Sequence, residues 1–312
     1  MGPPSTPDSP RSTPGSRTSA PFGRNLIAMV TPFTPAGDLD LDAAQRVASH
    51  LVDAGADGVV ISGTTGESPT TSDAEKDALL RAVLEAVGDR ATVMAGTGTN
   101  DTKHAIELSQ QAEKAGVHGL LVVTPYYNKP PQAGLLAHFR AVADSTGLPV
   151  MLYDIPGRTG TPIATDTLVR LAEHGRVVAV KDAKGDFAGM TEVLRRTDLA
   201  YYSGADEVNL ALLAIGGVGV VSVVGHVAAG EYAAMIRAVD AGDLATARAI
   251  DRKLVPAFQA IMTRTQGAIM AKAALEVQGV VQNRAVRLPL IPATDDQIRQ
   301  LRTDLQEADL AS

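Results

Sequence analysis

The chain has 312 residues, of which 45% are hydrophobic and 20% charged, and its net charge is −7. This is an ordinary globular composition, and the negative charge argues against nucleic acid as a partner, since phosphate binding needs a clustered positive surface. The absence of cysteines excludes disulfides and thiolate chemistry, and no apolar stretch reaches the roughly 20 residues that span a bilayer, so we expect a cytoplasmic protein without membrane contact.

The N-terminal residues 1–22 are rich in Pro, Ser, Thr, Gly and Arg and carry few apolar side chains. Such a stretch cannot bury enough surface to offset the entropy of ordering it, which predicts a disordered tail. It lacks the apolar segment of a secretory signal. Five prolines among its first fourteen residues argue against the amphipathic helix of a transit peptide.

From residue 25 onward, short apolar stretches alternate with helical patterns. The predicted strands are Leu26–Val30, Gly58–Ile61, Thr92–Ala95, Gly119–Val123, Val150–Tyr153, Val177–Val180, Leu199–Ser203 and Val218–Val224. The predicted helices between them include Ser72–Val87, which opens with a capping box, Thr102–Ala115 and Gln132–Ser145. Glycines stand at the expected helix ends, at positions Gly55, Gly88, Gly116, Gly147 and Gly175.

Strands that alternate with helices in this way are typical of a closed (β/α)8 barrel or of a doubly wound open sheet. The number of strands favours the barrel, and the first strand–helix turn lacks the GxGxxG fingerprint of a dinucleotide-binding sheet. We therefore predict a (β/α)8 TIM barrel over residues 23–242. We expect an appended helical segment over residues 243–312, with a helix break at Pro256.

Polar motifs follow several of the predicted strands, at the end of a barrel where catalytic groups gather. Strand two leads into Gly63-Thr64-Thr65-Gly66-Glu67, whose amides and hydroxyls suit a carboxylate, although a plain turn explains the string equally well. Strand four leads into the pair Tyr126-Tyr127, which suits packing or a subunit contact. After strand five, Arg158 lies in a Pro-Gly turn and could bind a carboxylate or remain a solvated loop residue.

Strand six leads directly into Lys181. Burial of this ammonium would lower its pKa and give a neutral amine that can form a Schiff base with a ketone. The alternative is a lysine whose side chain extends to the surface. If Lys181 points into the barrel, the alternation of side chains places Val177 and Ala179 inside, and Val178 and Val180 toward the helices.

The same alternation predicts that Tyr153 and Thr64 also point inward, with Val221 as an apolar wall. A lysine, a tyrosine and a threonine would then converge on one barrel mouth. Polar groups that point inward at separate strand ends are difficult to explain as packing. This convergence favours a catalytic Lys181.

These motifs resemble those of the dihydrodipicolinate synthase family, within the pyruvate-dependent class I aldolases. The matching stretches are Gly63-Thr64-Thr65-Gly66-Glu67, Thr124-Pro125-Tyr126-Tyr127-Asn128, Tyr153-Asp154-Ile155-Pro156-Gly157-Arg158-Thr159-Gly160 and Val180-Lys181-Asp182-Ala183. The resemblance implies condensation of pyruvate with L-aspartate 4-semialdehyde, the first committed step of diaminopimelate and lysine biosynthesis. It also implies a homotetramer of tight dimers, ping-pong kinetics and no cofactor; the histidines show no zinc-binding spacing either, and we expect most of them at the surface or at helix ends.

The resemblance also implies roles for the site residues. Lys181 forms the imine with pyruvate, and Tyr153 donates and accepts the protons. Thr64 links Tyr153 to Tyr127, which reaches in from a neighbouring subunit. The amides of Thr64 and Thr65 hold the pyruvate carboxylate.

Three further positions complete the implied site. Arg158 anchors the carboxylate of the aldehyde substrate, Val221 lies near the pyruvate methyl, and Gly204 lies on the same rim. Another pyruvate aldolase, such as a sialic acid lyase or a 2-keto-3-deoxy sugar acid aldolase, shares the lysine and the strand-five tyrosine. A catalytically inactive barrel that senses a ligand, and a flavin or phosphosugar barrel, are weaker alternatives.

One departure from the family concerns inhibition by lysine. Ser68, Asn100 and Tyr126 match the inhibitor site of lysine-sensitive members. Where those members commonly carry His, His and Glu, this chain has, in order, Asp73, Lys76 and His104. Lys76 would repel the inhibitor's ammonium group, so we expect weak or absent lysine feedback.

Overall fold

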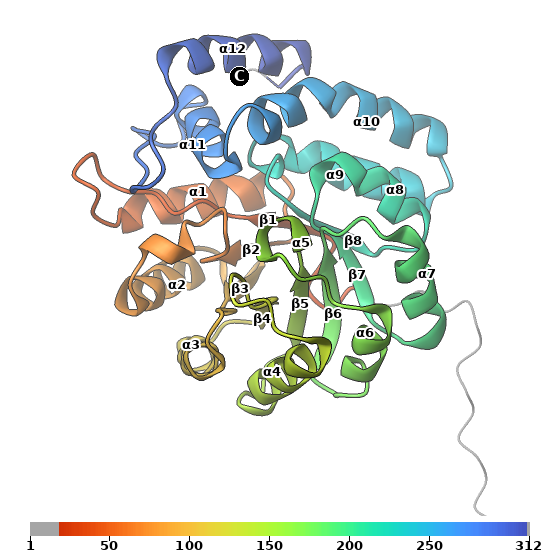
Figure 1. The fold of residues 1–312 in the computed structure, drawn as a ribbon. Coiled ribbons are helices and arrows are strands. Elements are labelled where there is room, and N and C mark those ends of the chain that lie inside the picture. The colour runs from red at the N-terminus through yellow and green to blue at the C-terminus, as the bar shows by residue number, and fades with distance from the viewer. Residues whose placement is uncertain (1–18, 311–312) are drawn as a thin grey trace, which may run out of the picture.

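Eight parallel strands close into a barrel in sequence order, β8 pairing with β1, in a computed structural model that describes residues 19–310 (Figure 1). The strands are β1 (Asn25–Ala28), β2 (Gly58–Ile61), β3 (Thr92–Gly96), β4 (Gly119–Val123), β5 (Val150–Asp154), β6 (Val177–Asp182), β7 (Ala200–Ser203) and β8 (Gly219–Ser222). The predicted (β/α)8 TIM barrel is confirmed.

Helices cover the outside of the barrel between successive strands (Figure 1). The α-helices are α1 (Leu41–Asp53), α2 (Asp73–Val87), α3 (Thr102–Ala115), α4 (Gln132–Asp144), α5 (Pro156–Thr159), α6 (Thr165–Leu171), α7 (Phe187–Arg196), α8 (Asn209–Ala214) and α9 (Gly225–Asp240), and the short 3₁₀ helices are η1 (Ser68–Thr70) and η2 (Asp206–Val208). The predicted capping box of α2 is present. Left-handed glycines follow α1 and α3, at Gly55 (φ 108°) and Gly116 (φ 92°). Gly88 also ends its helix, as the C-cap of α2, but with a right-handed φ of −67°. The prediction is wrong for Gly147 and Gly175, because α4 and α6 are capped earlier, at Ser145 and Ala172.

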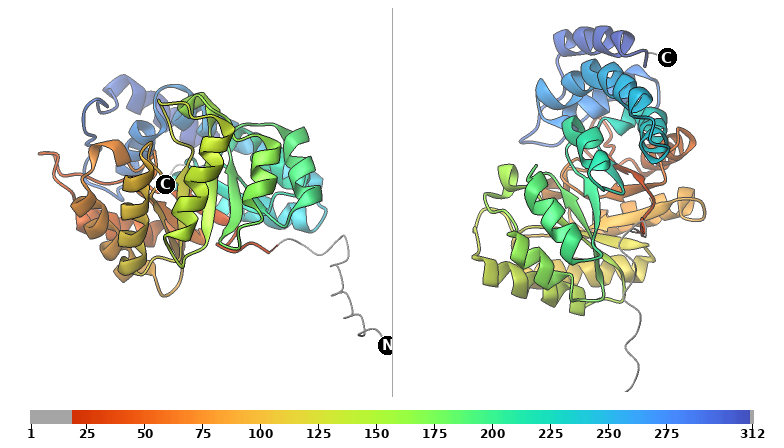
Figure 2. Two further views of the ribbon diagram at one scale, coloured as in Figure 1. Left: turned by 60° about the horizontal axis from the view of Figure 1, so that its bottom comes forward. Right: turned by 90° about the vertical axis from the view of Figure 1, so that its right-hand side faces the viewer.

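The C-terminal helices gather on one side of the barrel, where α10 and α11 pack on α9 and α12 packs on both (Figures 1 and 2). They are α10 (Leu244–Phe258), the π-helix η3 (Gln259–Thr263), α11 (Gly267–Val277) and α12 (Asp295–Glu307). The predicted break at Pro256 is wrong, because α10 continues through this proline to Phe258. The division into a barrel and a separate segment at residue 242 stays a prediction. None of the described helices is both long and apolar enough to cross a membrane.

Two apolar cores are separated by the strands, one inside the barrel and one between strands and helices. Ala179 lies in the inner core and Val180 in the outer core, as predicted. The prediction is wrong for the two residues before them: Val177 belongs to the outer core and Val178 packs against the inner one. A β-bulge explains this difference. In the pairing of β5 with β6, Val150 lies opposite Val177 and Met151 lies opposite Ala179, so Val178 has no partner on β5.

The bottom of the barrel is filled by Phe22, which is only 1% exposed and packs on Tyr202 with ring centroids 6.5 Å apart. Phe22 therefore belongs to the core and not to the tail in which we placed it. Residues 1–18 of that tail lie outside the described part of the chain.

Two of the six histidines, His138 and His226, are buried and the other four are not, so the expectation of mostly surface or helix-end positions is confirmed. Burial lowers the pKa of His226 to about 4 and that of His138 to about 4. The His226 ring joins the chain after β1 to the chain after β8, accepting from the Val30 N–H (3.1 Å) and contacting the Val223 carbonyl (2.7 Å). His226 thus stabilises the point where the barrel closes.

Candidate functional site

Lys181 on β6 is the buried cation of the barrel mouth, and it is 4% exposed. It pairs across the sheet with Tyr153 on β5, and its Nζ lies 4.1 Å from the centroid of the Tyr153 ring. Burial lowers the pKa of Lys181 to about 8; the charge of Asp206 opposes this shift and that of Arg158 adds to it. A neutral amine is therefore accessible near neutral pH, as Schiff-base chemistry requires.

Tyr153 is also buried, and burial raises the pKa of its phenol to about 12. The phenol therefore stays protonated at neutral pH and can donate a proton. Its side chain lines a cavity of about 500 Å³ at the mouth of the barrel. Thr64, Tyr127 and Arg158 line the same cavity.

The remaining predicted site residues do not line this cavity; they are Lys181, Thr65, Val221 and Gly204. Val221 is buried in the inner core beside Tyr153, and Thr65 is buried in the turn after β2. Gly204 lies against Lys181: a Cβ added at this glycine would stand 2.7 Å from Cγ and 2.9 Å from Cε of the lysine. Gly204 therefore provides the space that the Lys181 side chain occupies.

The turn after β2 presents free backbone donors. Within residues 19–310, no hydrogen bond has the N–H of Thr64 or Thr65 as its donor, whereas the Thr64 carbonyl accepts from the Glu67 N–H (3.1 Å). Consecutive free amides in a tight turn form a concave anion site. The turn is held in this shape by Ser62 and Glu67, which have positive φ angles of 58° and 53°.

Glu67 is fixed by residues more than two hundred positions away, which sequence reasoning missed. Its side chain is 1% exposed and forms an ion pair with Lys272 of α11, whose side chain is 3% exposed. Glu67 Oε2 also accepts from the Arg287 N–H (2.9 Å), and Lys272 Nζ donates to the Ala285 carbonyl (2.7 Å). We call these contacts the Glu67 anchor; they attach the C-terminal segment to the turn that carries Thr64 and Thr65.

Tyr127 follows β4 and is 89% exposed, with a φ of 74°. No hydrogen bond links the hydroxyls of Thr64, Tyr127 and Tyr153 in the part of the chain that the structure describes. The predicted proton relay is therefore not closed within one chain. An exposed tyrosine at the cavity edge is typical of a residue that contacts another subunit.

Arg158 lies on α5, a single helical turn whose N-terminal end is set by Pro156. Hydrogen bonds from the Arg158 and Thr159 N–H groups to the Ile155 carbonyl (both 3.0 Å) close this turn. It ends at Gly160, which has a φ of 75°, and a Cβ there would stand 2.7 Å from Lys129 Cε. The arginine is thus carried on a short, well-defined turn at the rim of the cavity.

A second residue that sequence reasoning missed is Asp206, a buried carboxylate after β7. It accepts from the N–H groups of Val223 (2.9 Å) and Val224 (3.0 Å) and from the Ser222 hydroxyl. Asp206 therefore shapes the chain that follows β8 and supplies the negative charge that opposes the fall in the Lys181 pKa. Its position two residues after Gly204 is the only signal that the sequence offered.

The residues compared with the inhibitor site lie next to one another. His104 Nε2 lies 3.0 Å from one Asp73 carboxylate oxygen, and Lys76 Nζ lies 4.0 Å from the other. Lys76 also donates to the Thr71 carbonyl and is largely buried. Within residues 19–310, no cluster of three or more His, Asp or Glu side chains could hold a metal ion.

The chain is similar to known proteins in both sequence and structure. The model of the "Dihydrodipicolinate synthetase family" matches residues 21–308. The 4-hydroxy-tetrahydrodipicolinate synthase of Kineococcus radiotolerans is 68% identical over 291 residues, which cover 93% of this chain and 94% of that protein. The synthase of the same name from Acidothermus cellulolyticus is 66% identical over 289 residues, 93% of each chain.

Among solved structures, the chain is similar to the lysine-bound synthase of Cyanidioschyzon merolae, with a TM-score of 0.89 and 42% identity over 93% of this chain and 99% of the other. Dihydrodipicolinate synthase DapA-2 of Bacillus anthracis gives a TM-score of 0.88 with 42% identity, covering 91% and 98% of the two chains.

Proposed function

The chain belongs to the dihydrodipicolinate synthetase family, and on that premise we propose that Lys181 is the residue that binds pyruvate as a Schiff base. The reaction is the condensation of pyruvate with L-aspartate 4-semialdehyde to 4-hydroxy-tetrahydrodipicolinate, in lysine and diaminopimelate biosynthesis. The observation that carries the residue assignment is the buried amine of Lys181, with its pKa of about 8, against the Tyr153 ring.

The chemistry begins when the neutral amine of Lys181 attacks the keto carbon of pyruvate. Loss of water then gives a cationic imine, with Tyr153 exchanging the protons that this step requires. The imine withdraws electrons, so a methyl proton of pyruvate leaves and an enamine forms. The enamine carbon attacks the aldehyde of the second substrate, and that substrate's own amine displaces Lys181 as the ring closes.

Binding of the two carboxylates is divided between two turns. The free amides of Thr64 and Thr65 hold the pyruvate carboxylate. Arg158, on the rim of the cavity, holds the carboxylate of aspartate semialdehyde. Val221 provides an apolar wall near the pyruvate methyl, and Gly204 leaves room for the lysine.

The assembly is part of the proposal. Tyr127 extends from the cavity edge into the site of a neighbouring subunit, where it joins Thr64 and Tyr153 in a proton relay; its 89% exposure within one chain supports this. We place the protein in the cytoplasm as a homotetramer built from tight dimers. The lack of cysteine, which leaves nothing to oxidise to a disulfide, is consistent with that compartment.

Borohydride trapping tests the residue assignment. Pyruvate with borohydride should add one reduced pyruvate to the peptide that contains Lys181, detected by mass spectrometry, and Lys181→Arg should abolish the adduct. A coupled assay then compares aspartate semialdehyde with sugar acids as the second substrate. An adduct on another lysine would refute the assignment of Lys181.

We further propose a weak or absent response to lysine. The Lys76 ammonium and the absence of a glutamate at position 104 disfavour a cationic effector in the group formed by Asp73, Lys76 and His104. A titration of activity with lysine should show less than half inhibition at millimolar concentrations. Strong inhibition by micromolar lysine would contradict the proposal.

A further inference from the structure

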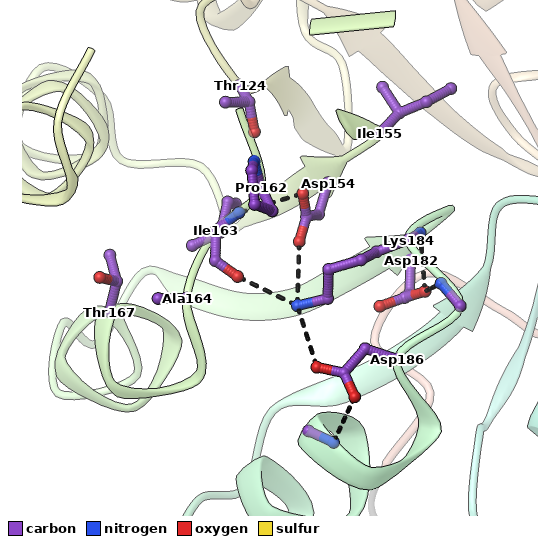
Figure 3. Close-up of polar contacts among 12 residues, drawn as sticks. Thr124, Asp154, Ile155, Pro162, Ile163, Ala164, Thr167, Asp182, Lys184 and Asp186 are labelled. Atoms are coloured by element: carbon purple, nitrogen blue, oxygen red, sulfur yellow. Dashed lines mark hydrogen bonds and ion pairs between the residues drawn. The ribbon is translucent and has the colours of Figure 1, made fainter. Parts of the chain in front are cut away.

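A buried ion pair outside the cavity connects the strand that carries Lys181 with the loop that carries Arg158. Lys184 follows β6, and its Nζ lies 3.3 Å from Asp154 Oδ2 at the end of β5. The side chain of Lys184 is 14% exposed and that of Asp154 is fully buried. Figure 3 shows the Lys184 ammonium between Asp154, Asp186 and the carbonyl of Ile163.

Both backbone groups of Ile163 are held by this pair. The Ile163 N–H donates to Asp154 Oδ1 (3.1 Å), and the Ile163 carbonyl accepts from Lys184 Nζ (3.0 Å). We call these two hydrogen bonds the Ile163 tether (Figure 3). The tether closes residues 155–162 into a loop whose two ends are both fixed to the barrel.

That loop contains α5 and therefore Arg158. Its first end is fixed by the sheet, since the Ala183 N–H donates to the Asp154 carbonyl (2.8 Å). Inside the loop, the hydrogen bonds of α5 and of the Thr159 hydroxyl are local, and the Pro162 carbonyl accepts from Gln132 Nε2 of α4 (2.9 Å). At the far end of the loop, the tether binds Ile163 to the ends of β5 and β6, while Gln132 of α4 binds its two neighbours, Pro162 and Ala164.

The ion pair is costly and needs an explanation. A fully buried carboxylate loses its hydration, and burial raises the pKa of Asp154 to about 6 even though Lys184 opposes the shift. Neutral residues could donate to and accept from the backbone here at less cost, because a buried ion pair is often no more stabilising than an apolar replacement. A charged pair instead gives shorter and stronger hydrogen bonds, which fix geometry closely.

We propose that Lys184 and Asp154 are positioning residues that act through Arg158: by holding both backbone groups of Ile163, they orient the guanidinium toward the carboxylate of the second substrate. This inference rests on the proposed function of Arg158. Neither residue of the pair lines the cavity. Removal of the pair should therefore leave the pyruvate step intact and weaken binding of aspartate semialdehyde.

The variants Lys184→Met and Asp154→Asn/Lys184→Met test the inference. Lys184→Met leaves a buried carboxylate without its partner, so its melting temperature should fall. In the double variant the melting temperature should recover, because neither charge of the buried pair remains and Asp186 is half exposed to solvent, while the Ile163 carbonyl stays without its donor. In both variants we expect the KM for aspartate semialdehyde to rise about tenfold, since a small misplacement of a binding group is costly, with unchanged borohydride trapping of pyruvate.

A purely structural pair would give the opposite result in the double variant, where KM would recover together with the melting temperature. Lys184→Met in an Arg158→Met background is the second test. If Lys184 acts through Arg158, the Lys184→Met substitution should not raise the KM for aspartate semialdehyde any further in the Arg158→Met background. A rise of the same size in both backgrounds would overturn the inference.

Arg196→Met is the matched control, because it removes a cation from the exposed pair with Asp166 on the same side of the barrel, and it should change neither KM nor trapping. Hydrogen exchange of residues 155–163 gives a readout that does not depend on the reaction. It should be faster in both Lys184 variants than in the wild type, and equal exchange would refute the tether. Failure of the proposed function would be distinct, since the wild-type chain itself would then lack the pyruvate adduct.

Discussion

At the scale of single residues, the charge state of Lys181 sets the pH dependence of the first step. Its pKa is lowered from 10.5 to about 8, so the neutral fraction rises as the pH passes through that value. Between pH 7 and pH 9 the rate of borohydride trapping at low pyruvate should rise about tenfold and then level off. A solvated lysine would give a rate that is still rising steeply at pH 9.

The charge of Arg158 provides the control for this profile. Arg158 lowers the Lys181 pKa, so Arg158→Met should move the midpoint of the profile to higher pH. The direction of this shift is specific to the charge. A variant whose structure is merely damaged would trap less pyruvate at every pH, and the midpoint of its profile would not move. An unmoved midpoint would show that the two groups do not interact.

Gly204 makes a second prediction at this scale. A methyl group there would overlap the Lys181 side chain, so Gly204→Ala should turn the amine away from the site and reduce pyruvate trapping about tenfold or more. Gly175→Ala is the control, since a Cβ there meets no atom within 4 Å. Trapping by Gly204→Ala at the wild-type rate, measured by mass spectrometry, would show that the lysine adjusts without loss.

At the scale of elements, the Glu67 anchor joins α11 to the turn after β2. Lys272→Met leaves a buried, unpaired Glu67, which should lower the free energy of unfolding by about 3–5 kcal/mol in urea titrations. Glu67→Gln in the same chain should recover part of this loss, because the uncompensated charge is gone. Because the anchor holds the turn with the free amides, the KM for pyruvate should rise in both variants.

The exposed pair Lys103–Glu107 is the control for that measurement. The Lys103 side chain is 85% exposed, so Lys103→Met should change the unfolding free energy by less than about 0.5 kcal/mol. Equal losses for Lys103→Met and Lys272→Met would mean that the anchor does not stabilise the fold.

The elements themselves were largely predictable, since buried strands and capped helices have local signals. β2 and β4 have the predicted bounds, and so does α3. The bulge at Val178 was not predictable, because it depends on how β6 pairs with β5 and not on the residues of β6 alone. The Glu67–Lys272 pair was missed for the same reason: contacts between distant residues leave no local pattern.

At the scale of the whole molecule, the barrel brings groups from separate strand ends to one mouth, and alternation along strands was enough to predict this for Tyr153 and Lys181. Thr64 also lines the cavity, as alternation predicted, but it does so from the turn after β2, two residues beyond Ser62, whose φ is 58°. The contribution of supporting groups such as Asp206 and Lys184 could not be predicted from the sequence, because it depends on their burial and on charged groups of other strands.

The proposed assembly makes the last prediction, because a site that takes Tyr127 from a second chain can be rebuilt from two defective chains. Lys181→Ala and Tyr127→Phe should each be nearly inactive alone. In a mixed dimer, the Lys181 of one chain meets the Tyr127 of the other, so one site per dimer is complete while the second lacks both groups. Mixing equal amounts of the variants under conditions that exchange subunits should therefore restore about a quarter of the wild-type activity, because half of the dimers are mixed and each mixed dimer has one complete site. Activity that stays at the sum of the two separate variants, with mixed dimers confirmed by native mass spectrometry, would place Tyr127 in the site of its own chain.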